Sequence, residues 1–218
     1  MNIKQHAIEF FATFLLTLAI FASLLVAGGI TTPLSAGIML GLLAFMLGSL
    51  TCLHVNPAVT VALLAFKKIA PKDAAFHILA QFAGAAFAML LVRTSGSVSA
   101  FVEQPVFDWH TALAEFVGTF FFAFGIASVV FKPAPAADQV SEPATDLTFP
   151  FVIGSSLAMG IMIASGLGST AMLNPAVAFG LGSFTLSYVL TPIAGAILGM
   201  WLYTYFAKPA KAEVPVQN

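Results

Sequence analysis

Two long stretches of this chain contain no Asp, Glu, Lys or Arg. The first runs from Phe10 to Phe66 and covers 57 residues, and the second runs from Leu147 to Ala207 and covers 61 residues. One helix that crosses a bilayer needs about 20 apolar residues. Each stretch is too long for two such helices with their turn and too short for three. Each therefore predicts two spans and one element of half length.

Glycine, proline and charged residues set the boundaries of these elements. Gly28, Gly29 and Pro33 separate a first span at about 8–27 from a second at about 34–52. The other predicted elements are the half-length segment 53–66, a third span at 74–92, a fourth at about 109–131, and two spans with a second half-length segment within 147–207.

Composition puts these helices in a membrane. Of the 218 residues, 60% are hydrophobic and 8% are charged, whereas a soluble domain has about 25% charged residues. The net charge of −1 comes without a basic run that could follow a phosphate backbone, so no nucleic-acid partner is expected. The single cysteine, Cys52, excludes an internal disulfide and a cysteine-rich metal site. We predict a multi-pass integral membrane protein, with a plasma (inner) membrane as the default location.

Basic residues predict the orientation of the spans. Cytoplasmic loops of membrane proteins carry an excess of Lys and Arg, and a cytoplasmic N-terminus leaves only Arg93 outside. The polar linker 132–147 and a disordered tail at 208–218 then also lie in the cytoplasm. We predict an all-α membrane protein of six transmembrane helices with both termini cytoplasmic. The basic residues on the cytoplasmic side are Lys4, Lys67, Lys68, Lys72, Lys132, Lys208 and Lys211.

The two halves of the chain resemble each other. Each repeat, at about 5–93 and 109–207, holds three spans, so the second must be inverted relative to the first, an architecture whose binding site lies near the membrane midplane. The two half-length elements then enter from opposite sides and meet near the centre. The matching segments are 9–14 with 115–120, 56–59 with 174–177, and 81–85 with 192–196.

The sequence Asn-Pro-Ala occurs once in each half-length element. Asn is a favoured N-cap and Pro suits the first helical position, so each motif predicts the start of a short helix inside the membrane. Non-helical backbone before it is tolerated only against protein or a water-filled cavity, which favours a pore. The positive ends of both helix dipoles would face the centre of the membrane. Both Asn amides would offer N–H donors there and hold a water by its oxygen, an arrangement that repels cations. A single copy would favour a simple helix cap; two matching copies favour the pore. The motifs are Asn56-Pro57-Ala58 and Asn174-Pro175-Ala176.

On these motifs the chain, from about residue 6 to 207, resembles the aquaporin and aquaglyceroporin family (major intrinsic proteins). The Glu-x-x-x-Thr pattern at Glu9 and Glu115, the His54-x-Asn-Pro-Ala-Val context and the Gly-Ala pairs of spans three and six add to the resemblance. It implies an aquaporin-like channel domain at 1–207 and a homotetramer in membrane lipid with one pore per protomer. It also implies passive movement of water or small neutral solutes, without a cofactor.

The resemblance also assigns roles to single residues. In such proteins a buried Glu braces each re-entrant loop, which suits Glu9 and Glu115; the alternative is that Glu9 only marks the membrane edge. His54 is either a pore-wall residue or a titrating gate, and the wall is favoured. The other residues expected to line the pore are Val55, Thr170, Met172 and Leu173.

The chain departs from the family pattern directly after the second motif. Typical members have an Arg where this chain has Val177, and the Asp that commonly follows it in glycerol channels is Ala178 here. The selectivity ring of the pore, the narrowest part in water-selective relatives, contains neither Arg nor His in this chain and is wholly apolar. This predicts broad or atypical selectivity, for water together with small neutral solutes such as glycerol, urea, ammonia or hydrogen peroxide. Counted without gaps, the filter positions fall on Ala36, Met162, Ala171 and Val177, and a slip of one residue would replace Met162 by Ile161.

Two other function classes remain as alternatives. An enzyme is disfavoured because nothing orients Cys52 or His54 for catalysis. A closed or structural member of the family is permitted by the missing Arg and disfavoured by the two intact motifs; the linker 132–147 could cover the cytoplasmic mouth. No metal site is expected, because no ligand spacing appears among His6, His54, His77 and His110.

Overall fold

The structure is a computed structural model that describes residues 3–26, 28–51, 53–96, 105–131 and 147–208. Nearly all of the linker predicted at 132–147 and of the tail predicted at 208–218 lies outside the described residues, as does Cys52. The described residues form helices and no strands. The helices are α1 (Ile3–Leu25), α2 (Thr32–Leu47), α3 (Pro57–Ala65), α4 (Pro71–Thr94), α5 (Trp109–Val130), α6 (Thr148–Gly166), α7 (Pro175–Gly180) and α8 (Leu186–Phe206).

The prediction of an all-helical membrane fold is confirmed. Five helices, α1, α4, α5, α6 and α8, are long and apolar enough to cross a membrane. The remaining predicted span, α2, has 16 residues and ends at Leu47 rather than near residue 52. A turn begins there because Gly48 and Ser49 are poor helix formers. The orientation of the spans remains a prediction.

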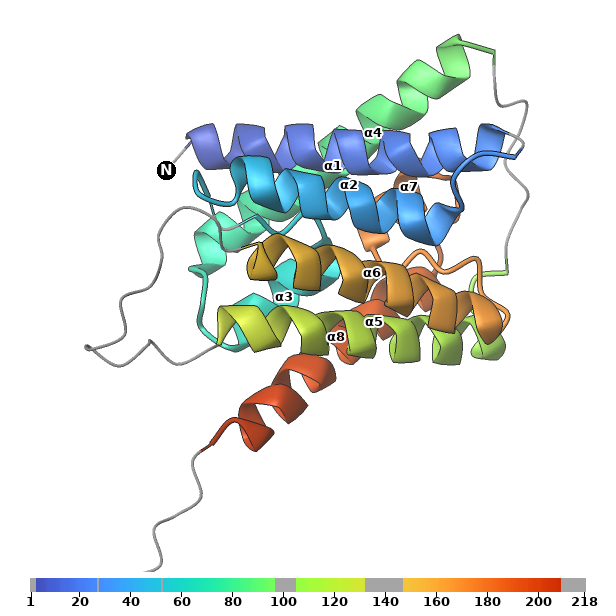
Figure 1. Ribbon diagram of the computed structural model, residues 1–218. Coiled ribbons are helices and arrows are strands. Elements are labelled where there is room, and N and C mark those ends of the chain that lie inside the picture. The colour runs from blue at the N-terminus through green and yellow to red at the C-terminus, as the bar shows by residue number, and fades with distance from the viewer. Residues whose placement is uncertain (1–2, 27, 52, 97–104, 132–146, 209–218) are drawn as a thin grey trace, which may run out of the picture.

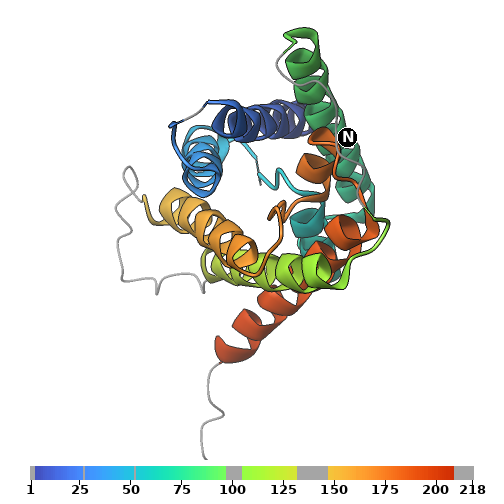
Figure 2. The ribbon, with the colours of Figure 1, turned by 90° about the vertical axis from the view of Figure 1, so that its right-hand side faces the viewer.

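The long helices surround the two short ones. Figure 2 shows α3 and α7 on the inner side of the ring that the long helices form, while α4 and α8 cross the others obliquely and project beyond them (Figure 1). α1 packs on α4, α5 packs on α8, and α2 packs on α6 between these pairs. This arrangement repeats the order of the two sequence repeats, since α5 to α8 correspond to α1 to α4.

Glycines allow the helices of each repeat to approach closely. A Cβ atom on Gly84 of α4 would lie 2.2 Å from the carbonyl oxygen of Phe10, and one on Gly195 of α8 would lie 2.4 Å from that of Phe116. Small residues at helix crossings are typical of membrane proteins, because packing rather than the hydrophobic effect drives association there. The same close crossing therefore occurs in both repeats.

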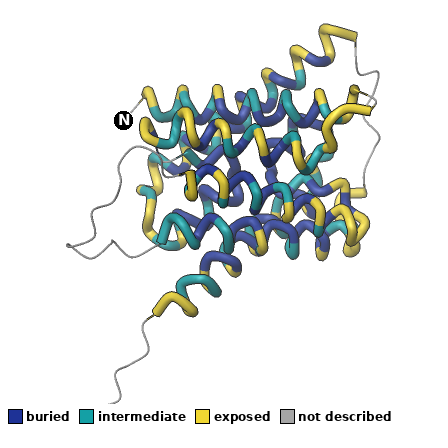
Figure 3. The backbone as a smooth tube through the Cα atoms, in the orientation of Figure 1, coloured by how far each residue is buried: buried dark blue, intermediate teal, exposed yellow. Residues whose placement is uncertain are grey.

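The distribution of apolar and polar groups is that of a membrane protein. Large apolar side chains such as Phe45, Phe151 and Leu198 are exposed on the outer surface, whereas Glu9 and Glu115 are fully buried. Figure 3 shows the buried residues concentrated on the inner faces of the helices and along α3 and α7. The polar groups that matter for function therefore lie inside the bundle.

Candidate functional site: a pore between two half helices

Each short helix begins at its Asn-Pro motif. Asn56 is the N-cap of α3, and its Oδ1 accepts a hydrogen bond from the backbone N–H of Ala58 (2.8 Å). Asn174 is the N-cap of α7, and its Oδ1 accepts from Ala176 (3.0 Å) and Val177 (3.3 Å). Both side-chain oxygens are thus committed to their own helix. Only the amide N–H groups remain for other partners.

The two asparagines connect the two halves of the protein. The Nδ2 of Asn56 donates to the carbonyl of Leu173 (2.8 Å), and the Nδ2 of Asn174 donates to the carbonyl of Val55 (2.8 Å). Each carbonyl belongs to the residue directly before the other asparagine, so the N-termini of α3 and α7 meet. An amide has two N–H groups, and one on each asparagine has no protein partner among the described residues. These two donors are available to a molecule in the pore.

The backbone before each asparagine is held in an unusual conformation. Val55 and Leu173 have φ values of 57° and 50°, in the left-handed region. That region is uncommon for any residue other than glycine and is a genuine outlier for a β-branched one such as Val55. Such strain persists only where the surroundings impose it, and here the imposing groups are two buried glutamates.

The carboxylate of Glu9 holds the first loop. It accepts hydrogen bonds from the backbone N–H groups of His54 (2.6 Å) and Val55 (2.8 Å). A third bond comes from the side-chain amide of Gln81 in α4 (2.7 Å). Glu9 is fully buried, and bonds to an ionised carboxylate are stronger than neutral ones. The loop is therefore attached to both α1 and α4.

The carboxylate of Glu115 holds the second loop in the same way. It accepts from the backbone N–H groups of Met172 (2.9 Å) and Leu173 (2.7 Å), and from the hydroxyl of Ser169 (2.6 Å). Sequence reasoning selected both glutamates but missed Gln81 and Ser169 as their partners. The detectable signal for Gln81 was an uncharged polar residue inside the otherwise apolar stretch 78–92.

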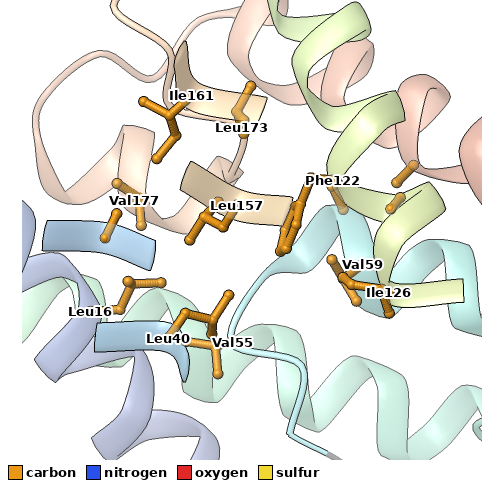
Figure 4. Close-up of a cluster of buried hydrophobic side chains, with 14 of the residues drawn as sticks. Leu16, Leu40, Val55, Val59, Phe122, Ile126, Leu157, Ile161, Leu173 and Val177 are labelled. Carbon is orange, nitrogen blue, oxygen red and sulfur yellow. The ribbon is translucent and has the colours of Figure 1, made fainter. Parts of the chain in front are cut away.

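The predicted filter residues do not all face the interior. Ala36, Ala171 and Val177 are buried, but Met162 is 53% exposed on the outer surface, whereas Ile161 is 3% exposed. Adjacent residues of an α-helix point about 100° apart, so both cannot face inward. The count that selected Met162 was wrong by one residue, and Ile161 is the inward residue of α6. Figure 4 shows Ile161 in the buried cluster with Val177 and Leu157.

The other predicted lining residues differ in their surroundings. His54, Val55 and Leu173 are buried, Met172 is half-buried, and Thr170 is exposed with its hydroxyl 2.6 Å from that of Tyr188. Apolar side chains that the sequence did not single out extend the interior surface between the loops and the helices (Figure 4). They include Leu16 of α1, Leu40 of α2, Phe122 of α5 and Leu157 of α6.

A cavity of about 340 Å³ leads from one end of the bundle to the first loop. Thr51, His54, Lys68 and Phe149 are among its lining residues, and the remainder are mostly apolar. Lys68 belongs to the basic cluster that predicts the cytoplasmic side. The cavity ends near His54 and the start of α3, and we call it the inner vestibule after this predicted side.

Three histidines far apart in sequence lie together beside this vestibule. His54 and His77 have ring centroids 5.0 Å apart, and His6 and His77 have centroids 5.2 Å apart. The fourth, His110, is exposed at the start of α5. Spacing along the chain showed no relation among them, because they come from α1, the first loop and α4.

Comparison with known proteins finds the same architecture elsewhere. Residues 1–203 match the family model described as Major intrinsic protein. The chain is 30% identical to Aquaporin AqpM of Methanothermobacter thermautotrophicus, over 93% of this chain and 96% of that protein, and 30% identical to Aquaporin-4 of Mus musculus, over 94% and 68%. Its fold is similar to the X-ray structure of the aquaglyceroporin from Plasmodium falciparum, with a TM-score of 0.69 and 18% identity over 94% of this chain and 96% of that one.

Proposed function

The chain belongs to the major intrinsic protein family, and we propose that its pore conducts water together with small neutral solutes through an apolar selectivity ring. Membership of this family means that the protein is an integral membrane channel of the class that passes water or small solutes, and not an enzyme. The proposal concerns which solutes pass and which residues select them.

The observation that carries the proposal is the chemistry of the inward ring. Ala36, Ile161, Ala171 and Val177 are all buried and all apolar. No side chain of this ring can donate a hydrogen bond to a solute or hold a fixed positive charge. Such a ring discriminates by size and by the cost of dehydration rather than by recognition of polar groups.

Cations are excluded by other parts of the pore. The N-termini of α3 and α7 meet, so the positive ends of both helix dipoles face the centre. The free N–H of Asn56 and that of Asn174 hold a water by its oxygen, which interrupts a chain of waters that could carry protons. An apolar ring adds the dehydration cost of an ion, which is several kcal/mol or more.

The ring is also narrow, which favours a second candidate function. Its four members are between 0% and 4% exposed, so little of their surface is open to a molecule the size of water. A narrow apolar constriction can close by losing its water. The alternative to a broad channel is accordingly a closed or structural member of the family.

Stopped-flow light scattering of proteoliposomes shocked with glycerol separates these functions. Faster shrinkage than in empty liposomes, followed by fast reswelling, supports the proposal. Fast shrinkage with reswelling at the rate of empty liposomes would reduce the channel to water alone. If folded protein changes neither phase, the closed or structural function stands.

Two substitutions test the ring directly. Ile161→Ala enlarges it and is expected to raise glycerol permeability about tenfold, equivalent to about 1.4 kcal/mol in the barrier. Met162→Ala, one residue along the same helix but on the outer surface, is the matched control and should leave permeability unchanged. Val177→Arg restores the residue typical of the family and should lower glycerol permeability more than water permeability. A larger effect at Met162 than at Ile161 would refute the assigned ring.

We also propose that the channel is a homotetramer of a plasma (inner) membrane. Support comes from the family resemblance and from the exposed apolar side chains on the outer helix faces. Native mass spectrometry of the protein released from detergent tests the assembly, and a monomer as the dominant species would contradict it.

A further inference from the structure

A cluster of metal-ligating side chains lies where the first re-entrant loop meets α1 and α4. One ligand atom each from Glu9, His54 and His77 lies within 4.8 Å of the others, and all three residues are buried. The Nδ1 of His77 is 3.8 Å from a carboxylate oxygen of Glu9. His6 packs against the ring of His77 and extends the cluster toward the start of α1.

Several polar atoms of this cluster have no hydrogen-bond partner among the described residues. Both ring nitrogens of His77 and both ring nitrogens of His6 are inaccessible to solvent and make no hydrogen bond within the described part of the chain. Buried polar atoms in native proteins are nearly always satisfied by protein, ordered water or an ion. Four orphaned nitrogens at one place therefore point to a bound species.

The hydrogen-bond network fixes which nitrogen of His54 is available. The hydroxyl of Thr60 donates to the carbonyl of Asn56 (3.0 Å) and accepts from the amide of Gln81 (2.9 Å). Its contact with the Nδ1 of His54 (3.1 Å) must then be a bond that Nδ1 donates. The neutral ring with a proton on Nδ1 leaves a free lone pair on Nε2, which is the form in which histidine binds a metal.

Glu9 can also accept one further partner. A carboxylate has about four lone-pair sites, and three of those on Glu9 are used by His54, Val55 and Gln81. The fourth site is available on the side where the Nδ1 of His77 approaches. Binding at that site does not require the loop to be released.

We propose that Glu9, His54 and His77 bind one divalent transition-metal ion of the zinc class. Two imidazoles and a carboxylate form an established zinc ligand set, with a fourth position left for water. Bonds of about 2.0–2.2 Å in a tetrahedral site bring ligand atoms to about 3.4 Å apart, so ligand atoms that are now up to 4.8 Å apart must approach by as much as about 1.4 Å. His54 lines the inner vestibule, which gives the ion and its water a route to the site.

The second repeat provides an internal comparison. The positions that match His6, His54 and His77 hold Ala112, Met172 and Tyr188. Glu115 has the same bond pattern to its loop as Glu9 but no imidazole beside it. The metal site is thus a property of the first loop alone.

The test is a titration of the purified, chelator-stripped full chain with Co²⁺, whose visible absorption reports four- or five-coordinate nitrogen and oxygen ligation. We expect one Co²⁺ per chain, displaced by Zn²⁺. His77→Tyr, which introduces the residue of the matching second-repeat position, and His77→Gln should each weaken binding by more than about a hundredfold, because loss of a direct ligand costs more than the tenfold to hundredfold loss typical of an outer-shell partner. His110→Gln, at the exposed histidine, should leave binding unchanged.

Folding of each variant is checked by gel filtration and by its thermal midpoint without metal. Absence of Co²⁺ binding by the folded wild type would overturn the proposal. Unchanged binding in folded His77→Tyr or His77→Gln, or an equal loss in His110→Gln, would also overturn it. The measurement involves no flux, so its outcome is independent of whether the pore conducts glycerol, water or nothing.

Discussion

In the first repeat the carboxylate of Glu9 is bound by Gln81, a side chain of the neighbouring helix α4, whereas in the second the carboxylate of Glu115 is bound by Ser169 of its own loop. The position that matches Gln81 is Pro192, which has no side-chain donor. Both loops nevertheless place a residue with positive φ before the asparagine and donate two backbone N–H groups to the glutamate. The repeat thus preserves the backbone geometry while the third partner of the carboxylate differs.

This difference has a mechanical consequence. The first loop is attached to two transmembrane helices, and its glutamate lies beside the histidine cluster. The second loop is attached to α5 through Glu115, and to α8 only away from the glutamate, where the hydroxyl of Thr170 contacts that of Tyr188. We infer that a disturbance of α4 reaches the first half of the pore directly, whereas α8 has no matching bond to the second glutamate among the described residues.

Removal of either glutamate is expected to have the largest effect. Glu9→Leu and Glu115→Leu each leave two buried backbone N–H groups unpaired. At about 1–3 kcal/mol for each group, this should lower the free energy of unfolding by about 2–6 kcal/mol. Tryptophan fluorescence during denaturant unfolding in mixed micelles measures this. Because both loops use two backbone donors, the two losses should agree within about 1 kcal/mol. A loss below about 1 kcal/mol in either variant would show that its loop keeps its conformation without the carboxylate.

Substitution of the third partner sharpens the comparison. Gln81→Leu removes the bond to Glu9 and the bond to the hydroxyl of Thr60, and Ser169→Ala removes the bond to Glu115 and the bond that Ser169 accepts from the backbone N–H of Ala171. In each variant the bond to the buried carboxylate alone is worth about 1.5–3 kcal/mol. Since the two sites share no partner, the double variant should be additive within about 0.5 kcal/mol. A clearly non-additive double variant would mean that the loops are coupled through the bonds of Asn56 and Asn174.

Substitution of the glycines at the close helix contacts, Gly84 between α4 and α1 and Gly195 between α8 and α5, tests a feature that the two repeats share. Gly84→Ala and Gly195→Ala place a methyl group against a backbone carbonyl in the same way, and overpacking of this kind costs about 1–3 kcal/mol. Gly166→Ala is the control, because a Cβ atom there meets nothing within 4 Å. Thermal midpoints should fall similarly in the two crossing variants and remain unchanged in the control. Unequal falls would mean that the two repeats differ in how far their helices can separate.

Some features of the pore could be predicted from the sequence and others could not, for physical reasons. Asn-Pro acts on the adjacent backbone, so the starts of α3 and α7 could be read locally. The register of α6 could not, because an error of one residue rotates a helix by about 100° and exchanges Ile161 for the exposed Met162. The family resemblance and the matching repeat positions of Glu9 and Glu115 suggested the bracing glutamates, but the third partner of each depends on which side chain reaches the carboxylate in three dimensions. The histidine cluster was invisible in the sequence because its rings come from three separate segments.

The smallest expected effect concerns Thr13 and Thr119, the threonines of the Glu-x-x-x-Thr pattern in the two repeats. Both are fully buried, and neither hydroxyl donates to or accepts from any described residue through its Oγ1. Replacement by Val keeps the shape and removes a polar group without a partner, which should change stability by no more than about 0.5 kcal/mol, with stabilisation as the expected sign. Unfolding of Thr13→Val and Thr119→Val measures this, and Thr17→Val, which removes a hydroxyl bonded to the carbonyl of Thr13 (2.8 Å), is the matched control. A loss above about 1 kcal/mol in one repeat alone would indicate an ordered water at that threonine, and would extend the difference between the two loops from their carboxylates to the helices that carry them.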